Sequence, residues 1–185
     1  MAGGSVNVRV ATPSDAEAVA AIYAPIVSET VTSFEAEPPT TREMAKRIAE
    51  TLRTHPWLVV ERGAKIIGYA YASKHRDRSA YRWSVDVAVY VSEEARRSGL
   101  GRALYEALIA ILQEQGFRSA FAGIALPNAA SVGLHEAVGF KPLGIYKDAG
   151  FKLGQWHDVG WWRLGLSEGP GVPEEPIPFA ALQGD

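Results

Sequence analysis

The spacing of hydrophobic residues changes abruptly within one segment, and this change constrains the fold more than any other feature. Trp83 and four valines alternate with other residues as far as Val91, which predicts a strand with one apolar face. Leucine and isoleucine then recur mainly at steps of three and four from Leu100 to Leu112, which predicts a helix ended by Gly116. A strand therefore leads into a helix through a short turn, as in mixed α/β proteins.

The turn between this strand and helix has the composition of an anion-binding loop. Residues 96–102 read Arg-Arg-Ser-Gly-Leu-Gly-Arg. Gly99 and Gly101 allow a ligand to approach the backbone closely, and the start of the helix directs free N–H groups and a positive dipole outward. With Arg96, Arg97 and Arg102 beside them, they predict a pyrophosphate site. Taken alone, the turn is equally consistent with a tight bend flanked by solvated arginines, and it lacks the Walker and dinucleotide-binding patterns.

The overall composition is that of an ordinary globular protein, so any binding of phosphate must be local to this turn. The 185 residues are 47% hydrophobic and 22% charged, which fits one globular domain. A net charge of -2 gives no general attraction to nucleic acid or acidic membranes, and no apolar run approaches the roughly 20 residues of a membrane span. The absence of cysteine excludes disulfides and a cysteine nucleophile, and fits a reducing compartment. The N-terminus lacks a signal-peptide pattern, so we expect a cytoplasmic protein.

The rest of the chain supplies further strands and helices in mixed order. Strands are expected at residues 6–10, 57–61, 66–73 and 119–125, with two closing strands before residue 166. Helices are expected at residues 12–27, 40–52 and 128–137. Thr40 and Glu43 have the spacing of a capping box.

The composition shifts to glycine, proline and glutamate near the C-terminus. We therefore divide the chain into a domain, residues 1–166, and an extended tail, residues 167–185. Phe179 and Leu182 give this tail apolar residues with which to lie on a partner.

The glycine–arginine turn resembles the coenzyme A motif of the GNAT superfamily of N-acetyltransferases, Arg-x-x-Gly-x-Gly after a hydrophobic strand. The resemblance implies an α/β GNAT fold: a twisted mixed sheet splayed between its fourth and fifth strands, with helices on both faces. It also implies that acetyl-CoA enters the splay, with its pyrophosphate on the turn already described. Val89 and Val91 would then present backbone groups to the pantetheine and thioester.

A second segment, residues 128–140, is similar to the Asn-x-x-Ala/Ser-x-x-x-Tyr helix and Gly-Phe pair of that superfamily. Asn128, Ser131 and His135 are spaced by three and four residues, so they share one helix face, which without the first motif would suggest a solvated face. His135 stands where the superfamily usually has tyrosine. The resemblance implies either an acid for the leaving thiolate or a hydrogen-bonded structural imidazole.

A narrower resemblance, to the phosphinothricin/methionine sulfoximine acetyltransferases, extends from about Val8 to Leu166. It rests on residues 32–35, 76–82, 83–91 and 154–159, and on the histidine at position 135. It implies a small amino acid-like amine substrate of the phosphinothricin, methionine sulfoximine or methionine sulfone class, and a homodimer.

Asp86 is the candidate general base. It lies in the strand before the cofactor turn and alternates with the valine face, where the resembled family has glutamate. A carboxylate inside an apolar strand needs a partner or a function. The alternative is a partly buried aspartate paired with a nearby arginine.

The substrate site is expected around the segment that precedes this strand. Arg76, Arg78 and Arg82 lie in this segment with Tyr81, and a solvated basic loop is the usual meaning of such a run. The resemblance implies that one or two of these arginines bind a substrate carboxylate or phosphinate, with Tyr81 among the substrate residues. By resemblance, Phe34, Glu35 and Trp156 complete the pocket wall. Lys74 and His75 depart from the pattern, because a more apolar pair is expected there.

We therefore expect direct acetyl transfer from acetyl-CoA to an amine in a ternary complex. The alternatives are acetylation of peptide N-termini or polyamines, and, from another class, a non-catalytic acyl-CoA-binding module. The histidines at positions 55, 75 and 157 have no convincing ligand spacing, so no metal site is predicted.

Overall fold

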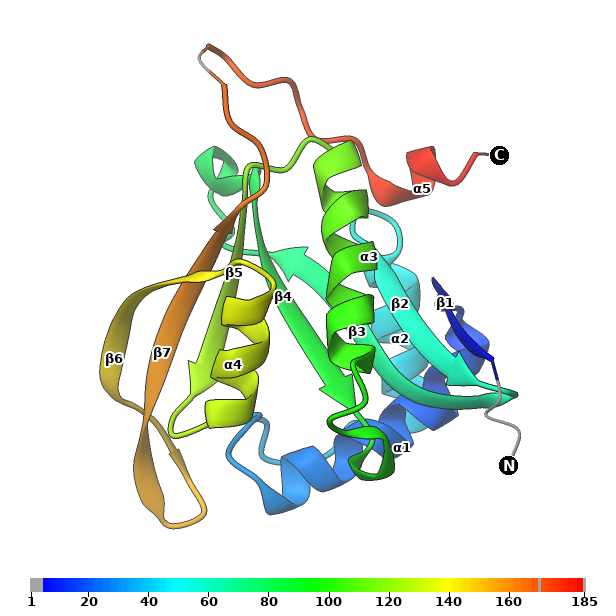
Figure 1. The fold of residues 1–185 in the computed structure, drawn as a ribbon, viewed down its shortest axis with the longest axis vertical. Coiled ribbons are helices and arrows are strands. Elements are labelled where there is room, and N and C mark those ends of the chain that lie inside the picture. The colour runs from blue at the N-terminus through cyan, green and yellow to red at the C-terminus, as the bar shows by residue number, and fades with distance from the viewer. Residues whose placement is uncertain (1–4, 170, 185) are drawn as a thin grey trace.

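A computed structural model describes residues 5–169 and 171–184 and contains a seven-stranded mixed sheet (Figure 1). The strands lie in the order β1-β2-β3-β4-β5-β7-β6, and only β4 and β5 pair in parallel. In chain order they are β1 (Val6–Val10), β2 (Trp57–Arg62), β3 (Lys65–Lys74), β4 (Ser84–Val91), β5 (Ser119–Ala125), β6 (Lys141–Lys152) and β7 (Gln155–Gly165). Each strand with predicted bounds is confirmed to within one residue at either end.

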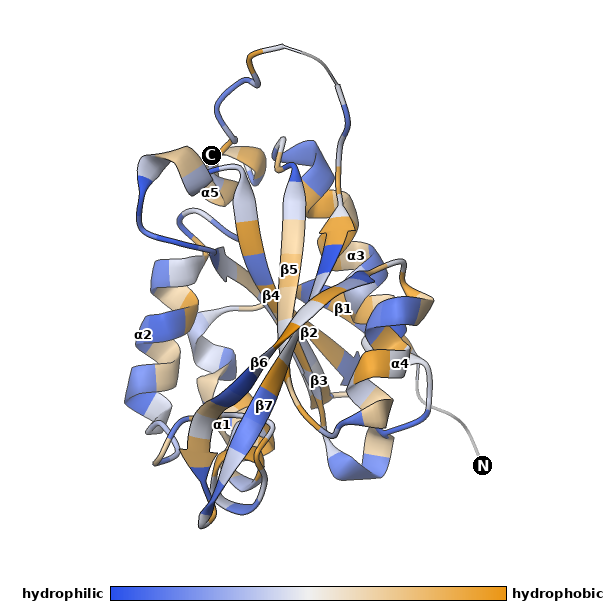
Figure 2. Ribbon diagram, turned by 90° about the vertical axis from the view of Figure 1, so that its left-hand side faces the viewer, coloured by the Kyte–Doolittle hydropathy of each residue, from blue (hydrophilic) through white to orange (hydrophobic). Residues whose placement is uncertain are grey.

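Helices cover both faces of this sheet, as predicted (Figures 1 and 2). One core contains residues of α1 (Ala16–Glu29) and α2 (Thr41–Thr51), and the other contains the apolar stripe of α3 (Leu100–Glu114). Apolar residues of α4 (Ala129–Ala137) pack against the α3 core. The capping box at the start of α2 is confirmed, because Thr40 N donates to Glu43 Oε2 at 2.7 Å and Glu43 N donates to Thr40 Oγ1 at 3.2 Å.

The sheet is splayed at its centre. The parallel pairing of β4 with β5 covers three register positions, Ser84 with Ser119, Val85 with Ala120, and Asp86 with Phe121. Beyond these positions the two strands diverge, and α4 lies beside the opening (Figure 1). The predicted splay between the fourth and fifth strands is therefore confirmed.

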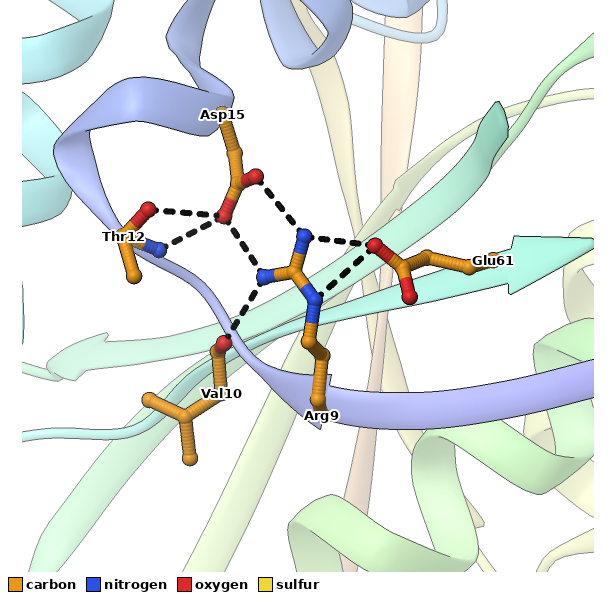
Figure 3. Close-up of polar contacts among 5 residues, drawn as sticks. All are labelled: Arg9, Val10, Thr12, Asp15 and Glu61. Carbon is orange, nitrogen blue, oxygen red and sulfur yellow. Dashed lines mark hydrogen bonds and ion pairs between the residues drawn. The ribbon is translucent and has the colours of Figure 1, made fainter. Parts of the chain in front are cut away.

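An ion-pair cluster fixes the first strand to its neighbours (Figure 3). Arg9 on β1 donates to both oxygens of Asp15, at 2.7 and 2.8 Å, and to Glu61 on β2 at 2.6 Å. Asp15 also accepts from Thr12 N at 2.7 Å and so closes a short 3₁₀ turn. The predicted first helix therefore begins with this turn, and α1 starts only at Ala16.

The tail folds back onto the domain and includes the short helix α5 (Phe179–Leu182). Phe179 is 1% exposed, and Gln115 Nε2 donates to Ile177 O at 2.7 Å and to Thr54 O at 2.9 Å. The expectation that Phe179 lies on a partner is therefore wrong, because this side chain is buried in its own chain. The division at residue 166 stays a proposal.

Candidate active site

The predicted pyrophosphate loop joins β4 to α3. Gly99 has a φ of 80° and directly precedes the helix, and Arg97 has a φ of 57°. Both values are left-handed, the conformation in which glycine is least strained. Arg96, Arg97 and Arg102 are all exposed, and Arg102 also forms an ion pair with Glu106 at 2.7 Å. The loop therefore presents exposed guanidinium groups beside the positive end of α3, an arrangement that fits a pyrophosphate.

Gly101 has a packing role that its sequence context does not reveal. A Cβ added at this position would lie 2.9 Å from Leu134 Cδ2, a side chain of α4. Glycine therefore lets α3 and α4 approach each other closely. Its predicted contact with pyrophosphate stays a prediction.

A cavity of about 50 Å³ lies in the splay. Its lining joins β4, β5 and α4, and includes the predicted residues Val89, Asn128, Ser131 and His135. A separate cavity of about 670 Å³ is lined by Val91, Arg96 and residues of α1. Within the described residues, no pairing with β5 extends along β4 beyond Asp86, so the edge of β4 that faces the splay is available to a ligand backbone.

His135 is buried and hydrogen-bonded at both ring nitrogens. Its Nδ1 lies 2.7 Å from Ser131 O, and a carbonyl oxygen only accepts, so Nδ1 carries the proton. Nε2 then accepts from the Tyr105 hydroxyl at 2.7 Å. Burial lowers the pKa of His135, against the opposing effect of the bond to Ser131, which favours the neutral ring.

The other two polar residues of this helix face serve its local geometry. Asn128 Oδ1 accepts from Ser131 N at 3.1 Å and so caps α4. Asn128, Ser131 and His135 all line the splay cavity, as their predicted common face requires.

Asp86 is paired with a histidine. His75 Nδ1 lies 2.6 Å from Asp86 Oδ1. Burial raises the pKa of the Asp86 carboxyl, while the hydrogen bond from His75 and the charge of Arg76 act in the opposite direction. The alternative pairing of Asp86 with an arginine is not observed among the described residues. Its partner is His75, a residue that departs from the family pattern.

One of the predicted substrate arginines lies at a cavity together with His75. Arg76 and His75 line a cavity of about 180 Å³ with residues of β5, β6 and β7. Arg78 is exposed at the start of the following 3₁₀ turn, and Tyr81 packs edge-on to His75 with ring centroids 6.0 Å apart. Arg82 instead binds Glu175 of the tail at 2.7 Å.

The three residues predicted to complete the pocket wall lie nearer the far end of the β6–β7 hairpin. The ring of Phe34 packs against Gly150. The Glu35 carboxylate accepts from both terminal nitrogens of Arg47, at 2.7 and 2.9 Å, and this pairing lowers its pKa. Trp156 is exposed and packs edge-on to Phe151. Among the described residues, these three line neither the splay cavity nor the cavity at His75.

Two residues of the site were missed as such by sequence reasoning. Tyr105 looks like one more apolar position of the α3 stripe, and only the fold shows that its hydroxyl meets His135. His75 was noticed for its unusual identity, which was the available signal, but its pairing with Asp86 depends on the register of β3 against β4.

The described ranges, 5–169 and 171–184, contain no cluster of three or more histidine or carboxylate side chains arranged to hold a metal ion. Their helices also include none that is both long enough and apolar enough to span a membrane.

Comparisons with known proteins agree with this geometry. Residues 8–161 match the acetyltransferase (GNAT) domain family. The chain is 39% identical to a phosphinothricin N-acetyltransferase of Streptomyces viridochromogenes, over 93% of this chain and 94% of that protein. It is 32% identical to an L-methionine sulfoximine/L-methionine sulfone acetyltransferase of Pseudomonas paraeruginosa, over 91% and 99% of the two chains.

A solved structure shows the same fold. A GNAT superfamily phosphinothricin acetyltransferase from Sinorhizobium meliloti, in complex with AcCoA, has a TM-score of 0.88 and 37% identity, covering 94% of this chain and 96% of that one. The splayed sheet, the loop before α3 and the family match lead to the same conclusion. The chain belongs to the GNAT superfamily and is an acetyl-CoA-dependent N-acetyltransferase.

Proposed function

We propose that this enzyme acetylates the α-amine of a small amino acid-like substrate of the phosphinothricin, methionine sulfoximine and methionine sulfone class. The observation that carries the proposal is the cavity at His75, where Arg76 lies beside the His75–Asp86 pair. A guanidinium group suits a carboxylate or phosphinate, and an adjacent base suits an ammonium group. The named relatives act on substrates of this kind.

We assign acetyl-CoA to the splay and the loop before α3. Arg96, Arg97, Gly99 and the first turn of α3 would hold the pyrophosphate, with Gly101 and Arg102 beside them. Val89 and Val91 would offer backbone groups to the pantetheine and thioester, next to Asn128 and Ser131. Bound there, acetyl-CoA supplies a thioester whose carbonyl carbon the amine attacks and whose sulfur leaves as the thiol.

The carboxylate of Asp86 drives removal of a proton from the substrate ammonium group. Its position follows from β4, which carries it within three residues of Val89 on the splayed edge. The neutral His135 ring uses its one N–H, at Nδ1, to donate to Ser131 O, and its Nε2 accepts from the Tyr105 hydroxyl. In this state His135 has no proton to give to a thiolate. We therefore assign thiolate protonation to water and give His135 the task of fixing the Tyr105 hydroxyl at the cavity wall.

Five further residues stay proposed as substrate contacts outside the reacting groups. They are Phe34, Glu35, Arg78, Tyr81 and Trp156. Tyr81 packs edge-on to His75 and Arg78 precedes it in the segment before β4, whereas Phe34 lies against Gly150 of the hairpin. A bound substrate or a second chain would have to bring Phe34 and Trp156 closer for them to contact the reacting amine.

The proposal is tested by measuring coenzyme A release with a panel of amines. The protein has no cysteine, so thiol reagents give no background from the enzyme. Methionine sulfone, methionine sulfoximine and phosphinothricin should be the best substrates. Faster release with polyamines or peptides would favour those alternatives, and tight acetyl-CoA binding without release on any amine would indicate a binding module.

We also propose a homodimer in the cytoplasm, where acetyl-CoA is available. The β6–β7 hairpin supports the dimer because it exposes an apolar surface, and six of its large side chains have solvent-exposed fractions between 52% and 62%. These side chains, which we call the hairpin patch, are Leu143, Ile145, Tyr146, Phe151, Leu153 and Trp156.

A further inference from the structure

The contact between His75 and Asp86 fixes which nitrogen of the imidazole carries a proton. His75 Nδ1 lies 2.6 Å from Asp86 Oδ1, and an ionised carboxylate only accepts hydrogen bonds. Nδ1 is therefore the protonated nitrogen of the neutral ring, and Nε2 has a free lone pair. A carboxylate that fixes a histidine in this tautomer is the arrangement by which a histidine becomes a general base.

The His75 ring is held rigidly by aromatic neighbours. It stacks on Phe121 with ring centroids 4.3 Å apart and an interplanar angle of 16°, and its side chain is 11% exposed. The rings of Tyr81 and Trp161 pack against it edge-on, at 6.0 and 6.2 Å. Within the described ranges, no residue hydrogen-bonds Nε2, so this nitrogen is available to a ligand.

The position of His75 suits an α-amino acid. An α-amino acid carries its ammonium and carboxylate groups on one carbon, and His75 and Arg76 are adjacent residues that line one cavity. A substrate whose carboxylate is bound by Arg76 therefore has its ammonium group near His75. Phe121 lines this cavity and Gly123 lines the splay cavity, so the two cavities adjoin β5 at positions two residues apart, about 7 Å along the strand.

We propose that the imidazole of His75, oriented by Asp86, takes the proton from the substrate ammonium group. This inference rests on the proposed function and specifies the group through which Asp86 acts. An N–H bond of the ammonium breaks, an H–Nε2 bond forms, and the carboxylate of Asp86 stabilises the resulting imidazolium. The proton then passes to water, while the amine keeps the electron pair with which it attacks the thioester.

The charged and titratable groups facing His75 are few. β4 contributes Asp86, the segment after β3 contributes Arg76 and Tyr81, and the cavity wall on β6 contributes Tyr146. The cavity residues of β5 and β7, Phe121 and Trp161, carry no titratable group. Asp86 is thus the one carboxylate in direct contact with the ring among these residues.

The test is His75→Gln, which retains a side-chain N–H donor for Asp86 but supplies no base. We expect kcat at saturating methionine sulfone to fall about 100-fold, the ordinary contribution of a general base, with acetyl-CoA affinity and Tm unchanged.

Imidazole added to His75→Ala should restore part of the rate. The double variant His75→Gln/Asp86→Asn should be little slower than either single variant, because the two residues act as one unit. Lys74→Gln, at the exposed neighbouring position, is the matched control and should keep wild-type kcat.

The outcomes separate this inference from the proposed function. A wild-type enzyme that releases no coenzyme A with any amino acid counts against the proposed function. An active wild type in which His75→Gln keeps more than about a third of kcat overturns the inference alone, because Asp86 must then act directly or through water. If the variants do not fold, ¹⁵N NMR of the wild-type protein decides. A proton on Nδ1 and none on Nε2 supports the inference, and the reverse tautomer overturns it.

Discussion

At the scale of single residues, Asp86 is the residue on which the proposed chemistry most depends. Its place in an apolar strand predicts that it needs a partner or a function. The fold supplies a partner, His75, from the end of the neighbouring strand. Sequence spacing indicates which face of β4 carries Asp86, but the identity of its partner depends on strand register and loop shape, which spacing does not encode.

Replacement of Asp86 by asparagine should reduce turnover. Asp86→Asn keeps the side-chain volume but removes the negative charge that makes His75 a base, so we expect kcat near neutral pH to fall by about 100-fold or more. The measurement is steady-state coenzyme A release at saturating substrate. Asp148→Asn, an exposed site whose left-handed backbone suits asparagine, is the control and should keep wild-type kcat. Near-normal turnover in Asp86→Asn would show that deprotonation does not need Asp86, and would leave it to His75 alone or to bulk water.

Although Asp86→Asn should lower kcat, it should raise the stability of the folded protein at pH 7. Burial raises the pKa of Asp86 above its ordinary value of 3.8, so the folded protein binds this proton more tightly than the unfolded chain. Protonated Asp86 therefore stabilises the folded protein. This stabilisation is complete below the pKa of Asp86 in the unfolded chain, and it is lost as the pH rises through the pKa of Asp86 in the folded protein. Ionised Asp86 therefore costs stability at pH 7, and Asp86→Asn should raise Tm there.

This increase should shrink as the pH is lowered toward the ordinary range of aspartate. Thermal melts of the wild type and Asp86→Asn over a pH series measure it. A variant that is less stable than the wild type at pH 7, by a margin that disappears at lower pH, would contradict this assignment.

At the scale of elements, the strand–loop–helix unit of β4 and α3 is the part most fully predicted from sequence. The change from period two to period 3.6 predicts both elements, and the glycines predict the turn between them. The contact of α3 with α4 is not predictable in this way. Gly101 and Tyr105 meet Leu134 and His135 only because α4 packs beside α3 at the splay.

This contact changes which substitution tests the loop. Gly101→Val would push against Leu134 and disturb α4, so a loss of acetyl-CoA affinity in that variant would not isolate a pyrophosphate contact. Arg96→Ala is the better test, because Arg96 is exposed.

We expect Arg96→Ala to weaken acetyl-CoA binding by about 10-fold or more, the effect of losing one charge-assisted hydrogen bond. Calorimetric titration measures this, and Tm should not change. Arg42→Ala, an exposed arginine on α2, is the matched control. Equal affinity of Arg96→Ala and the wild type would remove Arg96 from the pyrophosphate site.

At the scale of the whole molecule, the hairpin patch is an exposed apolar surface that the fold of a single chain does not explain. Sequence alternation predicts the two closing strands, but not that the large side chains of β6 remain exposed. A second copy that covers the patch would account for this exposure.

We therefore expect light scattering to give twice the chain mass of 20.0 kDa. Ile145→Glu, which places a charge in the patch, should shift the mass to that of one chain, because a charge buried without a partner opposes association. Val6→Glu, at an exposed apolar position on the edge strand β1, is the control and should remain dimeric. A wild-type protein with the mass of one chain would contradict the dimer.

The proposed site selects a substrate that carries both an amine and an anion. The most direct measurement compares coenzyme A release with methionine sulfone and with 3-(methylsulfonyl)propylamine, the same molecule without its carboxylate. We expect the amino acid to have the higher kcat/KM by about 10- to 150-fold, the value of one charge-assisted pair. Arg76→Ala should remove most of that difference by raising KM for methionine sulfone, with acetyl-CoA affinity unchanged. Equal acetylation of the two compounds by the wild-type enzyme would contradict the account.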